Sequence, residues 1–362
     1  MKNHRILWLT GLLLAGVALW QFGAHEANDL NPLDEPDTPA EAAALTFAHT
    51  HHSPAVDDRY HVEEFGIAAE IQSEPTGDPG AAYADDRIMV RAQGGVQVER
   101  LAERHETWVI RPAGPSGYAT FALPAGLDRA EFRGQLLEDD DVLDADRIGR
   151  IYGADAIEGS GALRTSPAIL DYQWPIAASP RPPPGTVAAS APAAVKVAVL
   201  DTGLAYEDHA DGVGLPSFDL VGIADPWDFV NGDDKPYDDH QHGSHIASVI
   251  ASWTDDGVDG AVGVAPGVTV MPIKVLDGDN AGYETDLLDA LAWAVEKDAQ
   301  IVNMSLSFGE GYILSAALDL ALSDAAASGA VLVAAAGNNG ASFVTYPAAH
   351  REVIAVGAGR LH

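Results

Sequence analysis

Cysteine is absent from the 362-residue sequence. Its absence excludes disulfide bonds, thiolate zinc sites, a cysteine nucleophile and a lipid-modified cysteine. Basic residues are scarce, because 20 Lys and Arg stand against 54 Asp and Glu, which gives a formal net charge of −34. Nucleic acid and anionic membrane surfaces would repel such a chain, so neither is expected as a partner. The acidity favours solubility, and carboxylates are also the ligands that calcium prefers.

Apolar residues make up 47% of the sequence, which is enough for a sizeable core. Residues 1–27 start with Lys2 and Arg5 and continue with an apolar run over residues 6–24, the layout of a secretory signal. The run is nearly long enough to span a bilayer, and the residues before Ala24 and Ala27 suit signal cleavage poorly. A cleaved signal and an uncleaved membrane anchor both stay open. Either one would send the rest of the chain out of the cytoplasm.

Two segments have the composition of linkers. Residues 28–84 are acidic, rich in Pro, Gly and Ala, and weakly periodic; they include His49, His51 and His52. Those histidines could bind a metal ion, but a disordered tract is the plainer interpretation of this composition. Residues 155–194, which contain "SPRPPPGTVAASAPAA", predict a linker and the start of the mature region.

Residues 85–154 predict a small α+β domain. Period-two and helical patterns alternate in the order strand, helix, strand, strand, helix, strand, which is the ferredoxin-like order. On the second predicted helix, one face is expected to carry Leu127, Phe132, Leu136 and Leu137.

Residues 195–362 change to short, nearly continuous apolar runs, typical of strands buried on both faces. These runs are "VKVAVLD", "VTVMPIKVL", "QIVNMSLS", "AVLVAAAG" and "EVIAVGA", and segments of helical period lie between them. The alternation predicts an α/β fold with a doubly wound parallel sheet. Function is then expected at the carboxyl ends of the strands.

Three polar residues fall at those strand ends. Asp201 terminates "VAVLDTG", His242 opens the helix after "DDHQHG", and Asn338 follows "VLVAAAG". A carboxylate, an imidazole and an amide at neighbouring strand ends are the orienter, base and oxyanion donor of acyl transfer. Each signal is weak alone, since Asp-Thr-Gly and Asn-Asn-Gly are usually turns. In this order and on this pattern, they indicate an active site.

At these residues the chain resembles the subtilisin-like serine peptidases, or subtilases. "VAVLDTGL" is similar to the family's aspartate motif, "HGSHIASVIA" to its histidine motif and "AAAGNNG" to its oxyanion-asparagine motif. "IVNMSLS" resembles the strand that lines the substrate cleft, and "YPAAHREVIAVGA" resembles the strand after the asparagine. The resemblance runs from about Tyr172 to Ala358. Residues 85–154 resemble the family's inhibitory propeptide.

The resemblance implies a role for each matching residue. His242 would be the general base rather than its neighbour His240, and His245 would be structural. Asp201 would orient His242, and Asn338 would donate to the oxyanion. Polypeptide substrates would pair, as an added strand, with Ser305, Leu306 and Ser307. The specificity pocket would be walled by these three residues together with Ala335, Ala336 and Gly337.

The nucleophile departs from the family pattern. The resemblance places it in a Gly-Thr-Ser-Met-Ala-x-Pro helix start after "VIAVGA", but no serine of this sequence lies in such a motif. The expectation is therefore a subtilase domain at 195–362 truncated before its serine, and a chain that is inactive as given.

The loop "WDFVNGDDKPYDDH" suggests a calcium site by the same resemblance. Asp228, Asn231 and Asp233 would be its ligands, together with backbone oxygens. The alternative is a solvated acidic loop.

The leading hypothesis is a serine-type endopeptidase made as a zymogen, with its own propeptide as intramolecular inhibitor. It would be secreted, or attached to a membrane by residues 6–24. The alternative is a non-catalytic truncated product or pseudoenzyme that binds peptides or a peptidase. A metallohydrolase is disfavoured, because no His-Glu-x-x-His helix is present.

Overall fold

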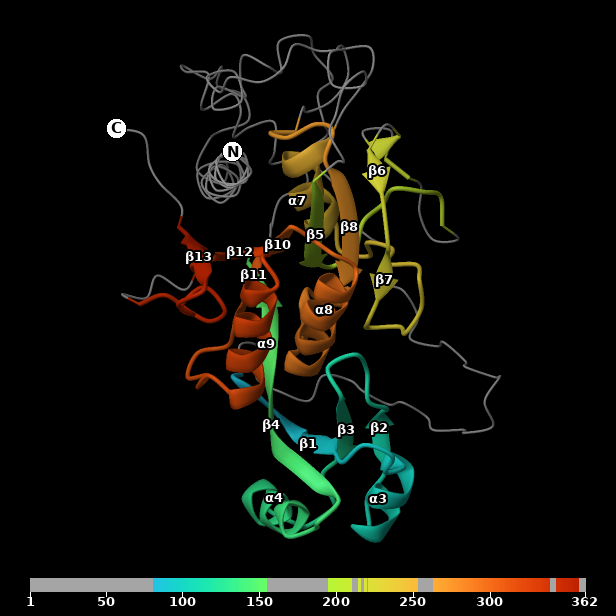
Figure 1. Cartoon of the computed structure of the whole chain (residues 1–362), viewed down its shortest axis with the longest axis vertical. Coiled ribbons are helices and arrows are strands. Elements are labelled where there is room, and N and C mark those ends of the chain that lie inside the picture. The colour runs from blue at the N-terminus through green and yellow to red at the C-terminus, as the bar shows by residue number, and fades with distance from the viewer. Residues whose placement is uncertain are drawn as a thin grey trace, which may run out of the picture.

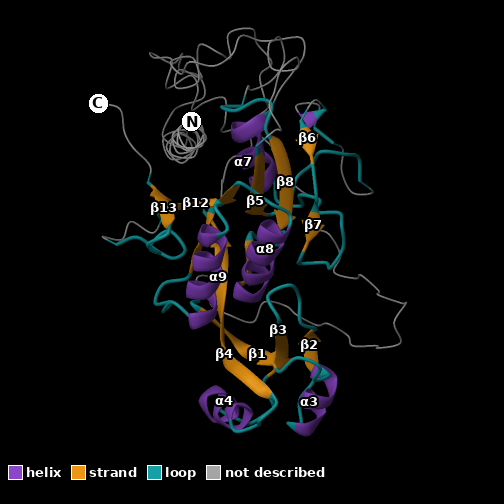
Figure 2. Cartoon of the chain, in the orientation of Figure 1, coloured by secondary structure: helices purple, strands orange, loops and turns teal. Residues whose placement is uncertain are grey.

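The computed structural model describes residues 81–154, 195–209, 214–215, 218–219, 221–252, 263–338 and 343–357. The predicted signal or anchor at 1–27, nearly all of the acidic linker with its histidines, and residues 155–194 lie outside the described residues. Within the described residues, no helix is long and apolar enough to cross a bilayer. Figure 1 and Figure 2 show the described elements in colour.

The N-terminal unit has the element order that its sequence pattern predicts. Its antiparallel sheet has the strand order β4-β1-β3-β2, and α3 and α4 connect the strands. The elements are β1 (Tyr83–Ala92), α3 (Val98–Arg104), β2 (Val109–Arg111), β3 (Tyr118–Ala122), α4 (Arg129–Leu137) and β4 (Val142–Gly153).

This unit has its own apolar core. Phe132 and Leu136 of α4 pack there against Ile88 and Phe121 of the sheet. The expectation that Leu137 shares their face is wrong, because its exposed fraction is 42%. Adjacent residues of a helix lie about 100° apart around its axis, so Leu136 and Leu137 cannot both face one core.

The C-terminal unit is built on the predicted parallel sheet, in the strand order β13-β12-β10-β5-β8-β6, with β7 paired to β8. All of these pairings are parallel. The strands are β5 (Lys196–Asp201), β6 (Gly222–Ile223), β7 (Trp227–Asp228), β8 (Thr269–Lys274), β10 (Ile301–Met304), β12 (Val331–Ala335) and β13 (Val353–Val356).

Helices cover both faces of this sheet, which explains why its strands are mostly apolar. On β5, Val197 and Val199 pack on the side of α7 (His242–Ala251). Ala198 and Leu200 pack on the opposite side, with α8 (Glu284–Glu296) and α9 (Ala316–Ala327). Figure 2 shows α8 and α9 lying side by side.

Strand β4 connects the two units. The predicted strand "QIVNMSLS" divides at Ser305 into β10, which joins the parallel sheet, and β11 (Leu306–Phe308), which pairs antiparallel with β4. On its other edge, β4 pairs antiparallel with β9 (Ala281–Tyr283). The end of β4 is therefore the central strand of a three-stranded ribbon whose other two strands belong to the C-terminal unit. Figure 1 shows β4 reaching from the N-terminal unit toward β11.

Candidate active site

Asp201 and His242 come together where β5 ends and α7 begins. The Nδ1 atom of His242 lies 2.6 Å from Oδ1 of Asp201, and both side chains are buried. A carboxylate at Nδ1 keeps a proton on that nitrogen and leaves Nε2 as the basic atom of the neutral ring. This geometry can make His242 a proton acceptor and stabilise its charged form.

The turn after β5 fixes the Asp201 carboxylate. The Thr202 backbone N–H donates to Asp201 Oδ1 at 2.7 Å. The Thr202 hydroxyl accepts from the Gly243 N–H at 2.8 Å, which ties this turn to the first turn of α7. A Cβ at position 243 would overlap the carbonyl oxygen of Gly203, so only glycine permits this close approach. Nothing in the local pattern distinguishes Thr202 from an ordinary turn residue.

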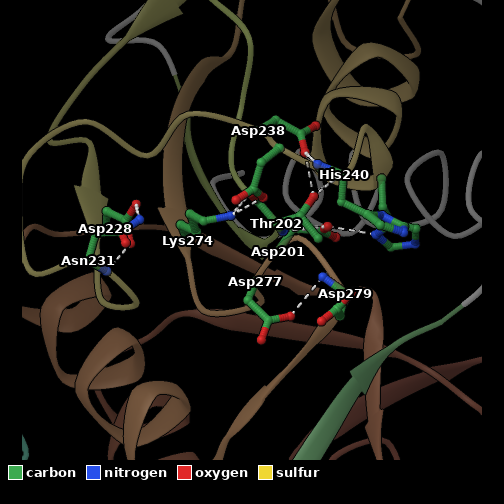
Figure 3. A network of polar contacts seen from close by, with 12 residues as sticks. Asp201, Thr202, Asp228, Asn231, Asp238, His240, Lys274, Asp277 and Asp279 are labelled. Atoms are coloured by element: carbon green, nitrogen blue, oxygen red, sulfur yellow. Dashed lines mark hydrogen bonds and ion pairs between the residues drawn. The ribbon is translucent and has the colours of Figure 1, made fainter. Parts of the chain in front are cut away.

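Asp238 organises the start of α7 from the loop before it. Its carboxylate accepts from the backbone N–H groups of Gln241 at 2.7 Å and Ser244 at 2.7 Å. It also accepts from the Thr202 hydroxyl at 2.7 Å. Asp238 therefore links the strand that ends at Asp201 to the helix that begins at His242 (Figure 3).

Lys274 lies at the end of β8, in register with Asp201. Its side chain is 1% exposed and its Nζ donates to the Thr202 carbonyl at 2.6 Å and to Asp239 Oδ1 at 2.6 Å. Figure 3 shows the ammonium directed at this turn. The apolar run "VTVMPIKVL" hides Lys274 in the sequence, because a lysine in such a run gives no sign of its partners.

The neighbouring histidines lie in different surroundings. Burial and the charge of His242 lower the pKa of His240. The same two causes lower the pKa of His245 to about 3. His245 is therefore neutral near pH 7. Of the histidines in "HQHGSH", it is His242 whose ring nitrogen contacts Asp201.

The end of β4 lies along the predicted cleft residues. Leu306 pairs with Gly153 and Ser307 with Tyr152. The Ser305 carbonyl accepts from the Ala154 N–H at 2.8 Å. These contacts are those of a peptide bound as an added strand.

Asn338 faces the same peptide segment. Its Nδ2 donates to the Ala154 carbonyl oxygen at 2.5 Å. Ala335 ends β12, and Ala336 and Gly337 connect it to Asn338. The Ala154 carbonyl therefore receives the bond that an oxyanion donor would make to the carbonyl of a scissile peptide.

Acidic residues of α8 contact the N-terminal unit. Asp289 accepts from Arg111 Nη2 at 2.8 Å and from the Ser116 N–H at 2.8 Å, and Asp286 forms an ion pair with Arg111. Burial raises the pKa of Asp289, and the charge of Arg111 opposes that rise. The sequence gives no sign of these pairs, because their partners lie more than 170 residues apart.

Glu284 opens α8 and is fully buried. Its carboxylate accepts from the Gly149 N–H of β4 at 2.8 Å, from the Tyr312 hydroxyl at 2.8 Å and from the Ser315 hydroxyl. Burial raises its pKa, which these hydrogen bonds partly offset. Glu284 therefore holds β4 by its backbone, ahead of the segment that reaches Asn338.

The residues of the predicted calcium loop are bonded to one another. Asp228 accepts from the Asn231 backbone N–H at 2.8 Å and side-chain Nδ2 at 2.9 Å, and Asp233 Oδ1 accepts from the Lys235 N–H at 2.8 Å. Across the described residues, no group of three or more His, Cys, Asp or Glu side chains is arranged to hold a metal ion. Calcium binding at Asp228, Asn231 and Asp233 stays a prediction from the sequence.

Comparison with known proteins shows which family the C-terminal unit resembles. Residues 193–360 match the sequence model of the Subtilase family. Subtilisin DY from Bacillus licheniformis is 39% identical over 168 residues, which cover 45% of this chain and 56% of that protein. Thermitase from Thermoactinomyces vulgaris is 34% identical over 161 residues, or 44% of this chain and 53% of that protein. The C-terminal unit is thus similar to the subtilases, and the chain spans about half the length of these relatives.

A solved structure extends the likeness of the fold. The crystal structure of fervidolysin from Fervidobacterium pennivorans, a keratinolytic enzyme related to subtilisin, is similar with a TM-score of 0.58 and 20% sequence identity. It covers 77% of this chain and 44% of that one. The structural likeness thus covers more of this chain than the family match does.

Proposed function

We propose that this chain carries the base, its orienter and the oxyanion donor of a serine-type endopeptidase. The observation that carries the proposal is a hydrogen bond at the end of the strand that lies in the cleft. There the Ala154 carbonyl accepts from the Asn338 side-chain amide at 2.5 Å. In this proposal, His242 Nε2 takes the proton of a serine hydroxyl as the oxygen attacks a peptide carbonyl carbon. The same proton then passes to the leaving amine.

The remaining residues act on the charge that develops during the attack. The carbonyl oxygen becomes an oxyanion in the tetrahedral intermediate, and Asn338 Nδ2 donates to it. Asp201 stabilises the imidazolium that forms at His242. Thr202, Asp238 and Lys274 are positioning residues, because they hold the turn and the helix start that carry this pair.

The nucleophile itself is expected outside residues 1–362, since this sequence holds no Gly-Thr-Ser-Met-Ala-x-Pro motif. The 362-residue chain should then bind peptide strands without turning them over. The product of the complete reading frame should cleave peptide bonds.

We further propose that residues 85–154 are an inhibitory propeptide. Gly153 and Ala154 occupy the cleft through backbone hydrogen bonds, as a cleaved product would. Contacts of Arg111, Ser116 and Gly149 with the acidic residues of α8 support docking of the whole unit. Processing is then expected between Ala154 and Asp155.

Export and calcium binding complete the proposal. Residues 6–24 would direct the chain out of the cytoplasm, as a cleaved signal or as an anchor. Calcium bound in the loop of Asp228, Asn231 and Asp233 would be structural, and no catalytic step depends on it.

The test uses the product of the complete reading frame and a fluorogenic peptide that ends in Gly-Ala before the reporter. We expect turnover that His242→Ala abolishes and His240→Ala largely keeps, and a mature N-terminus at Asp155. Equal loss in both variants would mean that His242 is not the base. Peptide binding without turnover would favour the pseudoenzyme.

A further inference from the structure

Gly153 is held on both edges in the cleft. Its N–H donates to the Asn280 carbonyl at 2.9 Å, and it pairs with Leu306 of β11 on the other side. Its neighbour Ala154 is fixed by Ser305 and Asn338. Gly153 therefore cannot shift sideways without breaking the pairing that presents Ala154 to Asn338.

The backbone of Gly153 does not itself require glycine. Its φ angle lies outside the left-handed region, so any residue could adopt its conformation. A Cβ built at this position, however, would overlap the side-chain amide of Asn280, with Oδ1, Nδ2 and Cγ as its nearest contacts. Asn280 alone supplies these nearest contacts.

The loop that carries the Asn280 side chain is held in place by its own hydrogen bonds. Asn280 has a φ of 58°, is 6% exposed, and donates its N–H to the Asp277 carbonyl at 3.0 Å. The Asp277 carboxylate accepts from the Asp279 N–H at 3.0 Å and the Ala281 N–H at 3.1 Å. Ala281 begins β9, which pairs with β4. The loop is thus fixed on both sides. A residue larger than glycine at the position of Gly153 would therefore have to rotate the buried side-chain amide of Asn280.

We propose that Asn280 is a specificity-determining residue that makes glycine the preferred residue at one substrate position. This position immediately precedes the residue whose carbonyl is attacked, as Gly153 precedes Ala154. This inference rests on the proposed peptidase function. A substrate with glycine where this chain carries Gly153 should be preferred, whatever residue stands at the position of Ala154.

The first test compares two fluorogenic peptides with the product of the complete reading frame. One has the sequence of residues 151–154, Ile-Tyr-Gly-Ala, and the other is Ile-Tyr-Ala-Ala. Inserting a methyl group into a packed site makes the binding free energy of the peptide in the cleft less favourable. We therefore predict a kcat/KM ratio of about tenfold in favour of the glycine peptide. In Asn280→Gly the ratio should fall to about threefold or less, since glycine accepts a φ of 58° and removes the amide.

The control is Asn280→Asp, which keeps the size of the side chain and also tolerates this φ. It should keep the preference for glycine. Cleavage of both peptides at equal rates by the unsubstituted protein would overturn this inference and leave the proposed peptidase intact. Cleavage of neither peptide would defeat the proposed function instead.

The second test needs no catalysis and uses the 362-residue chain. Hydrogen exchange of the Gly153 and Ala154 amides reports how often the end of β4 leaves the cleft, because both N–H groups are bonded to cleft carbonyls. Gly153→Ala should speed exchange at Ala154 by about tenfold, and adding Asn280→Gly should restore most of the protection.

Gly149→Ala is the matched control. A Cβ there would overlap Tyr312, Phe308 and Glu284 rather than Asn280. It should also speed exchange at Ala154, but Asn280→Gly should not restore protection. Unchanged exchange in Gly153→Ala, or a double variant that is no better protected than the single one, would overturn the inference.

Discussion

Replacing Arg111 by methionine should release the N-terminal unit from the C-terminal unit. The Arg111 guanidinium bonds Asp289 at 2.8 Å and pairs with Asp286, and the two carboxylate side chains are 1% and 8% exposed. Removing one partner of a buried ion pair costs about 3–5 kcal/mol, because a buried charge is left uncompensated. Arg111 is 24% exposed, and the Ser116 N–H still donates to Asp289. We therefore expect about 2–3 kcal/mol of lost docking free energy.

Hydrogen exchange at Ala154 in the 362-residue chain measures this loss. The expected free energy corresponds to exchange about 30–150 times faster than in the unsubstituted chain. The control is Arg104→Met, because Arg104 pairs with Asp139 and Asp141 inside the N-terminal unit and is 49% exposed. That variant should exchange within about twofold of the unsubstituted chain.

The effect of Arg111→Met should depend on pH with a defined sign. Burial raises the pKa of Asp289 in the docked state, and loss of the Arg111 charge removes the interaction that opposes this rise. A group whose pKa is raised by docking favours the docked state at low pH, and that stability is lost as pH rises through the docked pKa. The Met variant should thus dock best under acidic conditions and open as pH rises. Exchange that matches the unsubstituted chain at all pH values would refute the reasoning.

Further predictions concern the residues around Asp201 and Asn338. Asn338→Ala in the active form should lower kcat about 10²–10³-fold, the range measured when such a donor is removed from subtilisin, with little change in KM; a pure KM effect would make it a binding residue. Lys274→Met should lower the free energy of unfolding in urea by about 2–3 kcal/mol, because the Thr202 carbonyl and Asp239 lose a buried donor; an unchanged midpoint would contradict this. Gly243→Ala should separate α7 from the turn at Gly203 and slow peptide cleavage more than it raises KM; full activity would show that the close approach is dispensable.

The sequence predicts the local and periodic features of this fold well. Alternate residues of β5 pack against helices on opposite faces, and this double burial is why the strand is apolar from Val197 to Leu200. Asp201, His242 and Asn338 are also visible, because each lies at the start or end of a periodic segment. Their catalytic roles are still proposals.

Long-range pairings are beyond such a prediction. Nothing in "QIVNMSLS" indicates that it divides between two sheets, since the partner of β11 is a strand more than 150 residues earlier. The contacts of Asp289, Glu284 and Lys274 are of the same kind. Each joins a buried charged side chain to a backbone or side-chain group that only the folded chain brings near. Asn280 looks like a turn residue until the strand that carries Gly153 lies against it.

The most direct test of the peptidase proposal is labelling with a serine-directed fluorophosphonate, followed by mass spectrometry of the modified peptide. The 362-residue chain and the processed product of the complete reading frame are treated side by side, each with His242→Ala and His240→Ala variants. We predict one labelled serine, located outside residues 1–362, whose labelling is lost in His242→Ala and kept in His240→Ala. Stoichiometric labelling of a serine within residues 1–362, or labelling that survives His242→Ala, would contradict the account.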